Sequence, residues 1–276
     1  RKNHLFSSDI KSCTREIDEI VKSSSFLVIG AGGSIGQSVS KQIFLRNPKK
    51  LHCLDINENS LVELVRDLRS STGYIEGDFK TYVIDIGSQY YESLLIDQGP
   101  YDYVLNLSAL KHVRSEKDVY SLMRMIETNI IFTQSSLNKA IKHKTKKYFS
   151  VSTDKATNPE NLMGASKRIM EMCLSSSGNE IDISSARFAN VAFSDGSLLH
   201  GFTERIRKNQ PIAAPNDIQR YFITPQESGE LCLLSTLFGK SIDIFFPKFN
   251  PDLHLQTFSS LAVRYLDYLG YEPVSY

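Results

Sequence analysis

Short apolar runs alternate with amphipathic stretches along the first two thirds of the chain. Residues 26–29 form a β-branched and aromatic run followed by glycines, which is typical of a strand buried in a parallel sheet. A helix is expected at residues 34–46, stopped by Asn47 and Pro48. Similar runs predict further strands at residues 51–55, 82–84, 103–107, 148–152 and 181–187. This alternation predicts an α/β fold with a Rossmann-like, doubly wound parallel sheet.

The pattern changes toward both ends of the chain. Residues 1–24 contain apolar positions with helical spacing, so we expect an N-terminal helical segment that covers a sheet edge or an interface. After about residue 190, several prolines break the chain into short elements, with helices expected near residues 197–209, 226–238 and 255–269. We therefore predict a main domain at residues 25–190 and a smaller C-terminal lobe at residues 191–276.

Composition and charge exclude several classes of function. The chain has 32 basic and 31 acidic residues, so no overall field attracts nucleic acid or anionic lipid. The basic run at residues 142–147 is interpreted as a solvated helix end. No apolar stretch is long enough to cross a membrane. The four cysteines are scattered and the six histidines lack metal-ligand spacing, so we expect free thiols in a reducing, cytoplasmic compartment and no metal site.

A glycine-rich turn between the first strand and the first helix indicates dinucleotide binding. Gly30, Gly33 and Gly36 permit a tight turn and close approach of a pyrophosphate, while Ser34 and Ile35 open the helix whose N-terminus binds phosphate. Asp55 ends the second strand, 19 residues after Gly36. A carboxylate there accepts hydrogen bonds from the adenosine ribose hydroxyls and repels a 2′-phosphate, which favours NAD over NADP. Its alternative role is to cap the helix that follows Asn57.

The run from Thr153 to Lys167 resembles the catalytic apparatus of the short-chain dehydrogenase/reductases. In that superfamily a Ser or Thr ends a strand, and a helix carries Tyr-x-x-x-Lys, with Tyr as the proton carrier. Here Met163 occupies the Tyr position, and Asp154 and Lys155 directly follow Thr153. A thioether carries no proton, so other side chains must do the acid–base work.

This combination resembles the nucleotide-sugar 4,6-dehydratases of polysaccharide biosynthesis, particularly the UDP-N-acetylglucosamine 4,6-dehydratases with Met in place of Tyr that keep the C5 configuration. The resemblance covers nearly the whole chain and includes the segments at residues 107–113, 121–125, 187–190 and 220–222. Relatives usually continue past the position of Tyr276, so we expect the C-terminal lobe to be incomplete. A bound NAD and a UDP-sugar substrate are implied.

The resemblance also implies roles for individual residues. Thr153 would bind the sugar C4 oxygen, Lys167 the nicotinamide ribose, Asp154 would act as base for oxidation and acid for dehydration, and Lys155, in its neutral form, would be the C5 base. Further cofactor contacts are implied at Asp85, which would read the adenine amino group, and at Ile86, Ser108 and Ala109. Substrate contacts are implied at Lys111, His112, Asn190, Arg220 and Tyr221. For His112 and Tyr221, simple surface or packing roles are equally compatible with the sequence. Arg114 replaces a Pro common in relatives, which puts the shape of this loop in doubt.

Two other functions remain open at this point. A nucleotide-sugar epimerase on the same fold would normally keep Tyr-x-x-x-Lys and lack the Asp-Lys pair. A non-catalytic dinucleotide-binding protein would tolerate loss of the reactive groups, yet Thr153, Asp154, Lys155 and Lys167 are all present. In relatives, the regions around residues 118–141 and 161–177 form a four-helix dimer interface, so a homodimer or larger assembly is expected.

Overall fold

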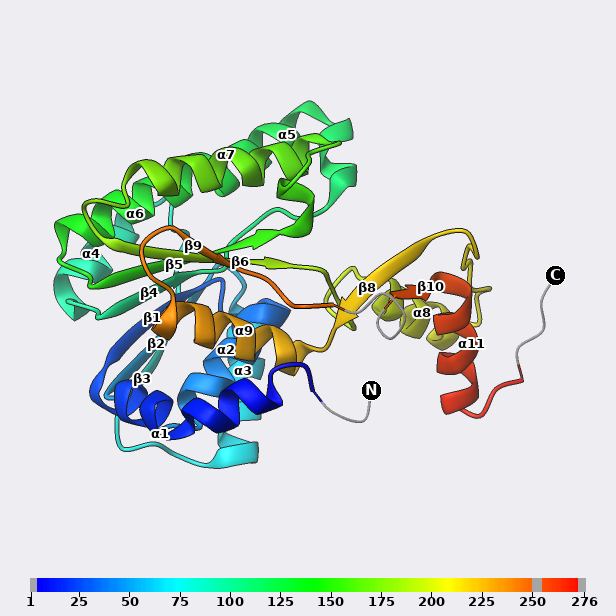
Figure 1. Ribbon diagram of the computed structural model, residues 1–276, viewed down its shortest axis with the longest axis horizontal. Coiled ribbons are helices and arrows are strands. Elements are labelled where there is room, and N and C mark those ends of the chain that lie inside the picture. Colours follow the sequence, from blue (N-terminus) through cyan, green and yellow to red (C-terminus); the bar gives the residue numbers. More distant parts are fainter. Residues whose placement is uncertain (1–3, 250–254, 273–276) are drawn as a thin grey trace.

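The computed structural model describes residues 4–249 and 255–272, and its main feature is a seven-stranded parallel sheet (Figure 1). The strand order is β3-β2-β1-β4-β5-β6-β9. The strands are β1 (Ser25–Ile29), β2 (Lys50–Asp55), β3 (Asp78–Val83), β4 (Tyr103–Asn106), β5 (Lys147–Thr153), β6 (Asp182–Phe188) and β9 (Asp243–Phe245). The order reverses between β1 and β4, which leaves a crevice at the carboxyl ends of these strands. The expected Rossmann-like sheet is confirmed.

Helices cover both faces of this sheet (Figure 1). On one face lie α1 (Ser7–Ser23), α2 (Ser34–Phe44), α3 (Glu58–Thr72) and α9 (Pro225–Phe238). On the other lie α4 (Gln89–Gln98), α5 (Val119–Ile126), the π-helical turn η2 (Glu127–Ile131), α6 (Phe132–Lys142) and α7 (Leu162–Ser176). Two short 3-10 turns, η1 (Val113–Lys117) and η3 (Asp154–Ala156), lie near the carboxyl ends of β4 and β5.

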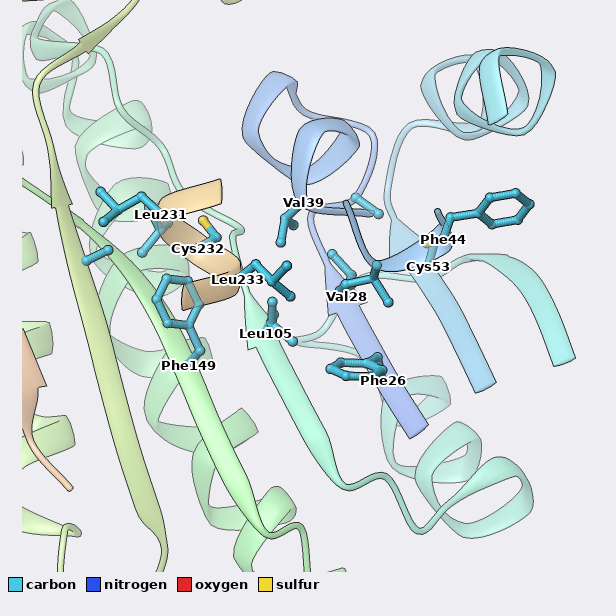
Figure 2. Close-up of a cluster of buried hydrophobic side chains, with 14 of the residues drawn as sticks. Phe26, Val28, Val39, Phe44, Cys53, Leu105, Phe149, Leu231, Cys232 and Leu233 are labelled. Carbon is cyan, nitrogen blue, oxygen red and sulfur yellow. The ribbon is translucent and has the colours of Figure 1, made fainter. Parts of the chain in front are cut away.

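Each face of the sheet carries its own apolar core because side chains alternate along a strand. Val28 of β1 packs in the first core, with residues of α2 and α9 (Figure 2). Its neighbours Leu27 and Ile29 pack in the second core, beneath α4, α6 and α7. The expected N-terminal helix is α1, which lies against α9 and buries Ile17 and Val21 in the first core.

A smaller lobe extends from the carboxyl ends of the strands (Figure 1). Its sheet has the order β10-β8-β7, from β7 (Asn190–Val191), β8 (Gln219–Ile223) and β10 (Leu255–Thr257). Two helices, α8 (Leu198–Arg207) and α11 (Phe258–Tyr268), pack through a separate apolar cluster that contains Leu199, Phe202 and Ala262. The expected helix near residues 255–269 therefore begins three residues later, because residues 255–257 form β10.

Two elements beyond residue 190, the helix α9 and the strand β9, lie with the large sheet and its helices. This differs from the expected division of the chain at residue 190. α9 packs on α2, and β9 pairs with β6, with Asp243 opposite Ser184. The chain therefore leaves the large sheet after β6, returns through α9 and β9, and then builds β10 and α11. Ten consecutive residues of α9 are buried, so this helix lacks the polar face that normally identifies a surface helix.

The basic run at residues 142–147 is only partly solvated. Lys142 pairs with Glu92 at 2.6 Å and Lys146 with Asp102 at 2.8 Å. Lys147 is buried, and its amine donates to the backbone oxygen of Gly239 at the end of α9. The expectation of a solvated helix end therefore fails for Lys147, which ties β5 to α9.

Exposed apolar side chains gather on α5 and α7, which contact each other. We call this the α5–α7 face, and its members are Val119, Tyr120, Met123, Ile126, Leu162, Ile169 and Met172. An apolar patch of this kind on adjacent helices is typical of an interaction surface.

Candidate active site

A cleft of about 430 Å³ lies at the carboxyl ends of β1, β4, β5 and β6, against the smaller lobe. Open α/β sheets bind ligands at this edge, where the strand order reverses. The expected site residues in its walls are Gly30, Gly33, Ser34, Ile35, Gly36, Ala109, Lys111, His112, Thr153, Lys155, Met163, Lys167 and Asn190. One cleft thus brings together the glycine turn, Lys111 and most of the predicted catalytic residues.

The glycine turn has the geometry that a phosphate cradle needs. Gly30 has φ +75°, and a Cβ on it would lie 2.8 Å from the backbone nitrogen of Ser108. A Cβ on Gly36 would lie 2.1 Å from the Gly30 oxygen, so α2 packs against the turn without room for a side chain. The N-terminus of α2 faces the cleft at Ser34 and Ile35. Its N–H groups lack helical partners, which favours a bound anion.

Asp55 lies beside this turn rather than in the cleft wall. Its carboxylate accepts hydrogen bonds from the backbone nitrogens of Gly32 at 2.8 Å and Asn57 at 2.9 Å. The cap of α3 is Asn57, whose side chain accepts from Ser60. Asp55 is therefore not the helix cap, and its position next to Gly32 is compatible with its predicted contact to a ribose.

Asp85 and Ile86 follow β3, one strand away from Asp55, and neither lines the cleft. Asp85 is half-buried in an ion pair with Arg124, and Ile86 is buried in the second core. Ser108 also lies outside the cleft lining, and its hydroxyl donates to Asn106 at 2.6 Å. Their predicted cofactor contacts stay predictions.

Thr153, Asp154 and Lys155 form one connected group where β5 ends. The Thr153 hydroxyl donates to Oδ1 of Asp154 at 2.9 Å, and the Lys155 amine donates to the same oxygen at 3.1 Å. Thr153 also caps η3 by accepting from the Lys155 backbone nitrogen. Asp154 does not itself line the cleft and remains half exposed, but it links the two side chains that do.

Met163 and Lys167 project from consecutive turns of α7 into the same cleft. Gly164 lets α7 approach η3, because a Cβ there would lie 2.6 Å from the Lys155 oxygen. The Lys167 amine donates to the Val151 oxygen at 3.0 Å. Burial lowers the pKa of Lys167 to about 8, and the charge of Glu171 only partly opposes that shift.

The carboxylate of Glu171 is hydrogen-bonded by Arg187 and Ser152 and not by Lys167. Arg187 donates two hydrogen bonds to its carboxylate, at 2.9 and 2.7 Å, and the Ser152 hydroxyl donates at 2.6 Å. Burial acts to raise the pKa of Glu171, but these donors outweigh it and the pKa is lowered. Lys167 therefore keeps a desolvated amine without a close carboxylate, which explains its lowered pKa.

The loop after β4 carries Lys111 and His112 into the cleft. Asn129 in η2 clamps this loop: its amide accepts from Leu110 N at 3.0 Å and donates to Leu110 O at 3.0 Å. The same amide donates to the Ser166 hydroxyl of α7 at 2.9 Å. Asn129 thus joins the loop to α7. Asn129 was not predicted as a site residue, although a π-helical turn such as η2 is often found at functional sites.

Lys111 lies opposite a loop that the sequence analysis also missed. Burial by the cleft walls lowers the pKa of Lys111, and Asp195 opposes that shift. The backbone nitrogen of Asp195 donates to the Ser34 hydroxyl at 3.2 Å, which joins the smaller lobe to α2. The missed cleft residues in this loop are Ser194, Asp195, Gly196, Ser197 and Leu198. Their only signal in the sequence is the Ser-Asp-Gly-Ser turn before a helix.

Arg220 and Tyr221 do not line the cleft, contrary to expectation. Arg220 is exposed, and its guanidinium donates to the Gln219 oxygen at 2.8 Å. The Tyr221 ring stacks on Phe249 at 4.6 Å between centroids. Side chains alternate along β8, so Tyr221 and Phe222 face opposite ways, and Phe222 lines the cleft. Arg220 shares the strand face of Phe222 but is not part of the cleft lining.

Neither a metal site nor a membrane-spanning helix is found in the part of the chain that the structure describes. Within residues 4–249 and 255–272, no group of three or more His, Cys, Asp or Glu side chains is arranged to hold a metal ion. No helix in those ranges is both long enough and apolar enough to cross a bilayer.

Comparison with known proteins places these features in a family context. The chain is 30% identical over 266 residues to an uncharacterized membrane protein of Methanocaldococcus jannaschii, covering 94% of this chain and 77% of that protein. It is 31% identical over 236 residues to the probable polysaccharide biosynthesis protein EpsC of Bacillus subtilis, covering 84% of this chain. The chain spans 39% of the length of EpsC.

Solved structures share the fold. Pen from Bacillus thuringiensis superimposes with a TM-score of 0.80 at 25% identity, covering 92% of this chain and 77% of that one. A dTDP-glucose 4,6-dehydratase from Streptomyces venezuelae with NAD and TYD bound has a TM-score of 0.73 at 19% identity, over 90% and 82% of the two chains. A UDP-N-acetylglucosamine 4-epimerase from Methanobrevibacter ruminantium has a TM-score of 0.75 at 18% identity, over 91% and 84%.

The family model described as "Polysaccharide biosynthesis protein" matches residues 26–273, a range that contains the glycine turn, the Thr-Asp-Lys group and the Met163–Lys167 helix. The chain therefore belongs to this polysaccharide biosynthesis protein family.

Proposed function

We propose that this chain is a NAD-dependent nucleotide-sugar 4,6-dehydratase that converts UDP-N-acetylglucosamine to a UDP-4-keto-6-deoxy sugar. The observation that carries the proposal is the arrangement of Thr153, Asp154 and Lys155 next to Met163. A carboxylate and an amine are hydrogen-bonded to one another where a tyrosine would otherwise carry protons. The family, and a fold shared with a dehydratase that binds NAD, support the same function.

The glycine turn fits a dinucleotide. Gly30 and Gly36 leave no room for side chains, so the backbone itself forms the surface that a pyrophosphate would contact. Asp55 would hold the adenosine ribose and Lys167 the nicotinamide ribose. The chemistry supplied by NAD in this cleft is removal of a hydride from C4 of the sugar and its later return to C6.

We assign two proton transfers to Asp154: removal of the proton from the C4 hydroxyl and protonation of the C6 hydroxyl. Its Oδ1 already accepts the Thr153 hydroxyl, so a C4 hydroxyl bonded to Thr153 can pass its proton to Asp154 as C4 is oxidised. The 4-ketone then acidifies the hydrogen on C5. Asp154 then donates the same proton to the C6 hydroxyl, which leaves as water. This step regenerates the carboxylate of Asp154.

The proton at C5 is assigned to Lys155, which lines the cleft. Its neutral amine takes the C5 proton while the C6 hydroxyl leaves, and its ammonium returns a proton to C5 when the hydride reaches C6. One water is lost and both side chains end in their starting states, so the sequence balances. Lys167, a buried residue of the cleft wall, would place positive charge near the oxygen at C4.

Substrate binding is assigned to Lys111 and Asn190, which line the cleft from the loop after β4 and from β7. An ammonium suits the diphosphate of a nucleotide sugar, and an amide suits its remaining polar groups. His112 also faces the cleft, with its ring against Gly196. For Arg220 and Tyr221, a substrate contact would require a rearrangement of β8 on binding.

A second copy of the chain is the proposed partner of the α5–α7 face. This face carries large apolar side chains on two adjacent helices: Tyr120 is 78% exposed, Met123 57% and Met172 61%. The resemblance to four-helix dimers in the dehydratase family supports the same arrangement.

An epimerase is the main alternative, since a UDP-glucose 4-epimerase of Rickettsia canadensis is 27% identical over 234 residues. Epimerisation at C4 needs one proton carrier at the C4 hydroxyl, but no base at C5 and no acid at C6. Asp154 alone would then serve as the proton carrier at C4 in place of the tyrosine that Met163 replaces, and Lys155 would be superfluous.

Mass spectrometry, which detects the loss of water, and NMR, which reports the configuration at C4, together separate these possibilities. The protein is incubated with UDP-N-acetylglucosamine and NAD+, and a product lighter by one water supports the dehydratase. A product of unchanged mass with inverted C4 would identify an epimerase. Unchanged substrate in the presence of bound NAD would contradict the proposal and favour the non-catalytic binding protein.

A further inference from the structure

The loop after β3 holds a carboxylate in a fixed orientation. Asp85 lies two residues beyond β3, and the adjacent Ile84 nitrogen donates to the Asp55 oxygen at 3.0 Å. The two acidic residues therefore lie at neighbouring strand ends. Oδ1 of Asp85 accepts from the Gly87 nitrogen at 2.8 Å, and the Ser88 hydroxyl donates to the Asp85 backbone oxygen at 2.7 Å.

The second oxygen of this carboxylate is held by a residue that the sequence analysis did not assign. Arg124 of α5 donates from Nη2 to Oδ2 of Asp85 at 2.7 Å. Its guanidinium carbon lies 5.2 Å from the centre of the Phe132 ring. That ring packs on Gly87, because a Cβ there would lie 2.5 Å from it. Arginine, aromatic ring and loop thus support one another.

The arrangement keeps Asp85 ionised and able only to accept hydrogen bonds. Burial acts to raise the pKa of Asp85, but the Gly87 N–H and Arg124 outweigh it and the pKa is lowered. Each carboxylate oxygen has a second lone pair that these two donors leave free. Both side chains are more than one third exposed, so a ligand can reach them. A fixed acceptor of this kind favours an amino group and disfavours a carbonyl oxygen.

Resting on the proposed function, we propose that Arg124 is a positioning residue for the adenine subsite. It orients Asp85 to accept the 6-amino group of the cofactor purine, and so makes the site select 6-aminopurine dinucleotides over 6-oxopurine dinucleotides. Arg124 acts through Asp85 and needs no contact with the cofactor itself.

The test compares two dinucleotides that differ only at this position. Binding of NAD+ and of nicotinamide hypoxanthine dinucleotide, which carries a 6-oxo group, is measured by calorimetry. We expect the wild type to bind NAD+ about tenfold or more tightly, the effect of one hydrogen bond to a charged acceptor. In Arg124→Met we expect NAD+ affinity to fall about fivefold and the preference to shrink to about twofold. Arg124→Lys, which keeps the charge but loses the fork, should lie between them.

Arg66→Met is the matched control, because Arg66 is an exposed cation on α3 that pairs with exposed Glu63. It should leave both affinities unchanged. Equal losses for both dinucleotides in Arg124→Met, or tighter NAD+ binding, would overturn the positioning role while leaving the proposed function intact. So would a wild type that binds the two dinucleotides equally. Failure of the wild type to bind either one would overturn the inference and the proposed function together.

Discussion

The Lys155 amine lies 3.1 Å from Oδ1 of Asp154, the oxygen that also accepts the Thr153 hydroxyl. One carboxylate oxygen therefore connects the residue proposed to bind the C4 oxygen with the residue proposed to act at C5. This connection allows a single carboxyl group to take a proton at C4 and release it at C6. A tyrosine at position 163 is then unnecessary.

Replacing Met163 by another apolar side chain should change the dehydration activity little. Met163→Leu keeps the size of the side chain, and Met163 carries no proton in the proposed reaction, so kcat/KM should stay within about threefold of the wild type. Asp154→Asn removes the proposed proton carrier and should lower kcat by about 10² to 10⁴. Steady-state dehydration rates check both values. Equal losses in the two variants would show that Met163 takes part more directly.

Substitutions of Gly36 and Gly33 in the turn should separate an effect on stability from an effect on cofactor binding. In Gly36→Ala the new Cβ would meet the Gly30 oxygen at 2.1 Å, so we expect a loss of about 1–3 kcal/mol in the free energy of unfolding. In Gly33→Ala its nearest contact is ordinary, at 3.5 Å, but the Cβ would stand where α2 meets the cleft. Gly33→Ala should keep its stability and bind NAD+ about tenfold more weakly. Thermal unfolding and calorimetry distinguish the two, and a stable, tight-binding Gly36→Ala would contradict the geometry.

Lys167 should leave a pH signature in the stability of the cofactor-free protein. Its pKa is about 8 when folded and 10.5 when unfolded, so between these values the unfolded chain holds a proton that the folded protein has released. Stability therefore rises with pH across this window, by up to about 1.4 kcal/mol per pH unit, and is lowest below pH 8.

Denaturant unfolding of the wild type and of Lys167→Met from pH 7 to pH 10.5 isolates this contribution. The variant should be more stable at pH 7, by about 3 kcal/mol, and the difference should shrink as pH rises. Lys167→Met should also lose activity, since the charge near C4 is gone. A constant difference in stability across the pH range would contradict the lowered pKa of Lys167.

A charge on the α5–α7 face should prevent assembly. Met172 is 61% exposed, so Met172→Glu should fold normally, yet a carboxylate opposite its own copy in a symmetric dimer costs several kcal/mol. Sedimentation should show a dimeric wild type and a monomeric variant. Tyr268→Glu is the control, because Tyr268 is 83% exposed on α11, away from this face. A monomeric wild type would exclude the proposed partner.

The strands of the large sheet were largely predictable because each is a short buried run with a glycine or polar stop. β3 was harder: its burial is incomplete, and it begins at Asp78, four residues before the predicted start. β9 has three residues and was missed. Its place in the sheet depends on pairing with β6, about 60 residues earlier, which no local pattern records.

The site residues also fall into two groups, those that belong to a local motif and those whose roles depend on contacts with distant segments. The glycine turn and the residues Thr153, Lys155, Met163 and Lys167, which belong to local motifs, line one cleft. Asn129 and Asp195 were missed because their roles arise from contacts with Leu110 and Ser34, in distant segments. Arg220 and Tyr221 were placed by resemblance alone. The side-chain alternation of β8 turns Tyr221 away from the cleft and Phe222 toward it, and exposed Arg220 lies outside the cleft lining.

The most direct test of the proposed acid–base pair is the fate of the C5 hydrogen in heavy water. Wild type and Lys155→Met are incubated with UDP-N-acetylglucosamine and NAD+ in D2O, and the sugar is followed by NMR. The wild type should give a 4-keto-6-deoxy sugar with deuterium at C5 and retained configuration, whereas Lys155→Met should bind NAD+ normally and incorporate none. Normal deuterium incorporation by Lys155→Met, or an intact sugar with the wild type, would contradict the assignment.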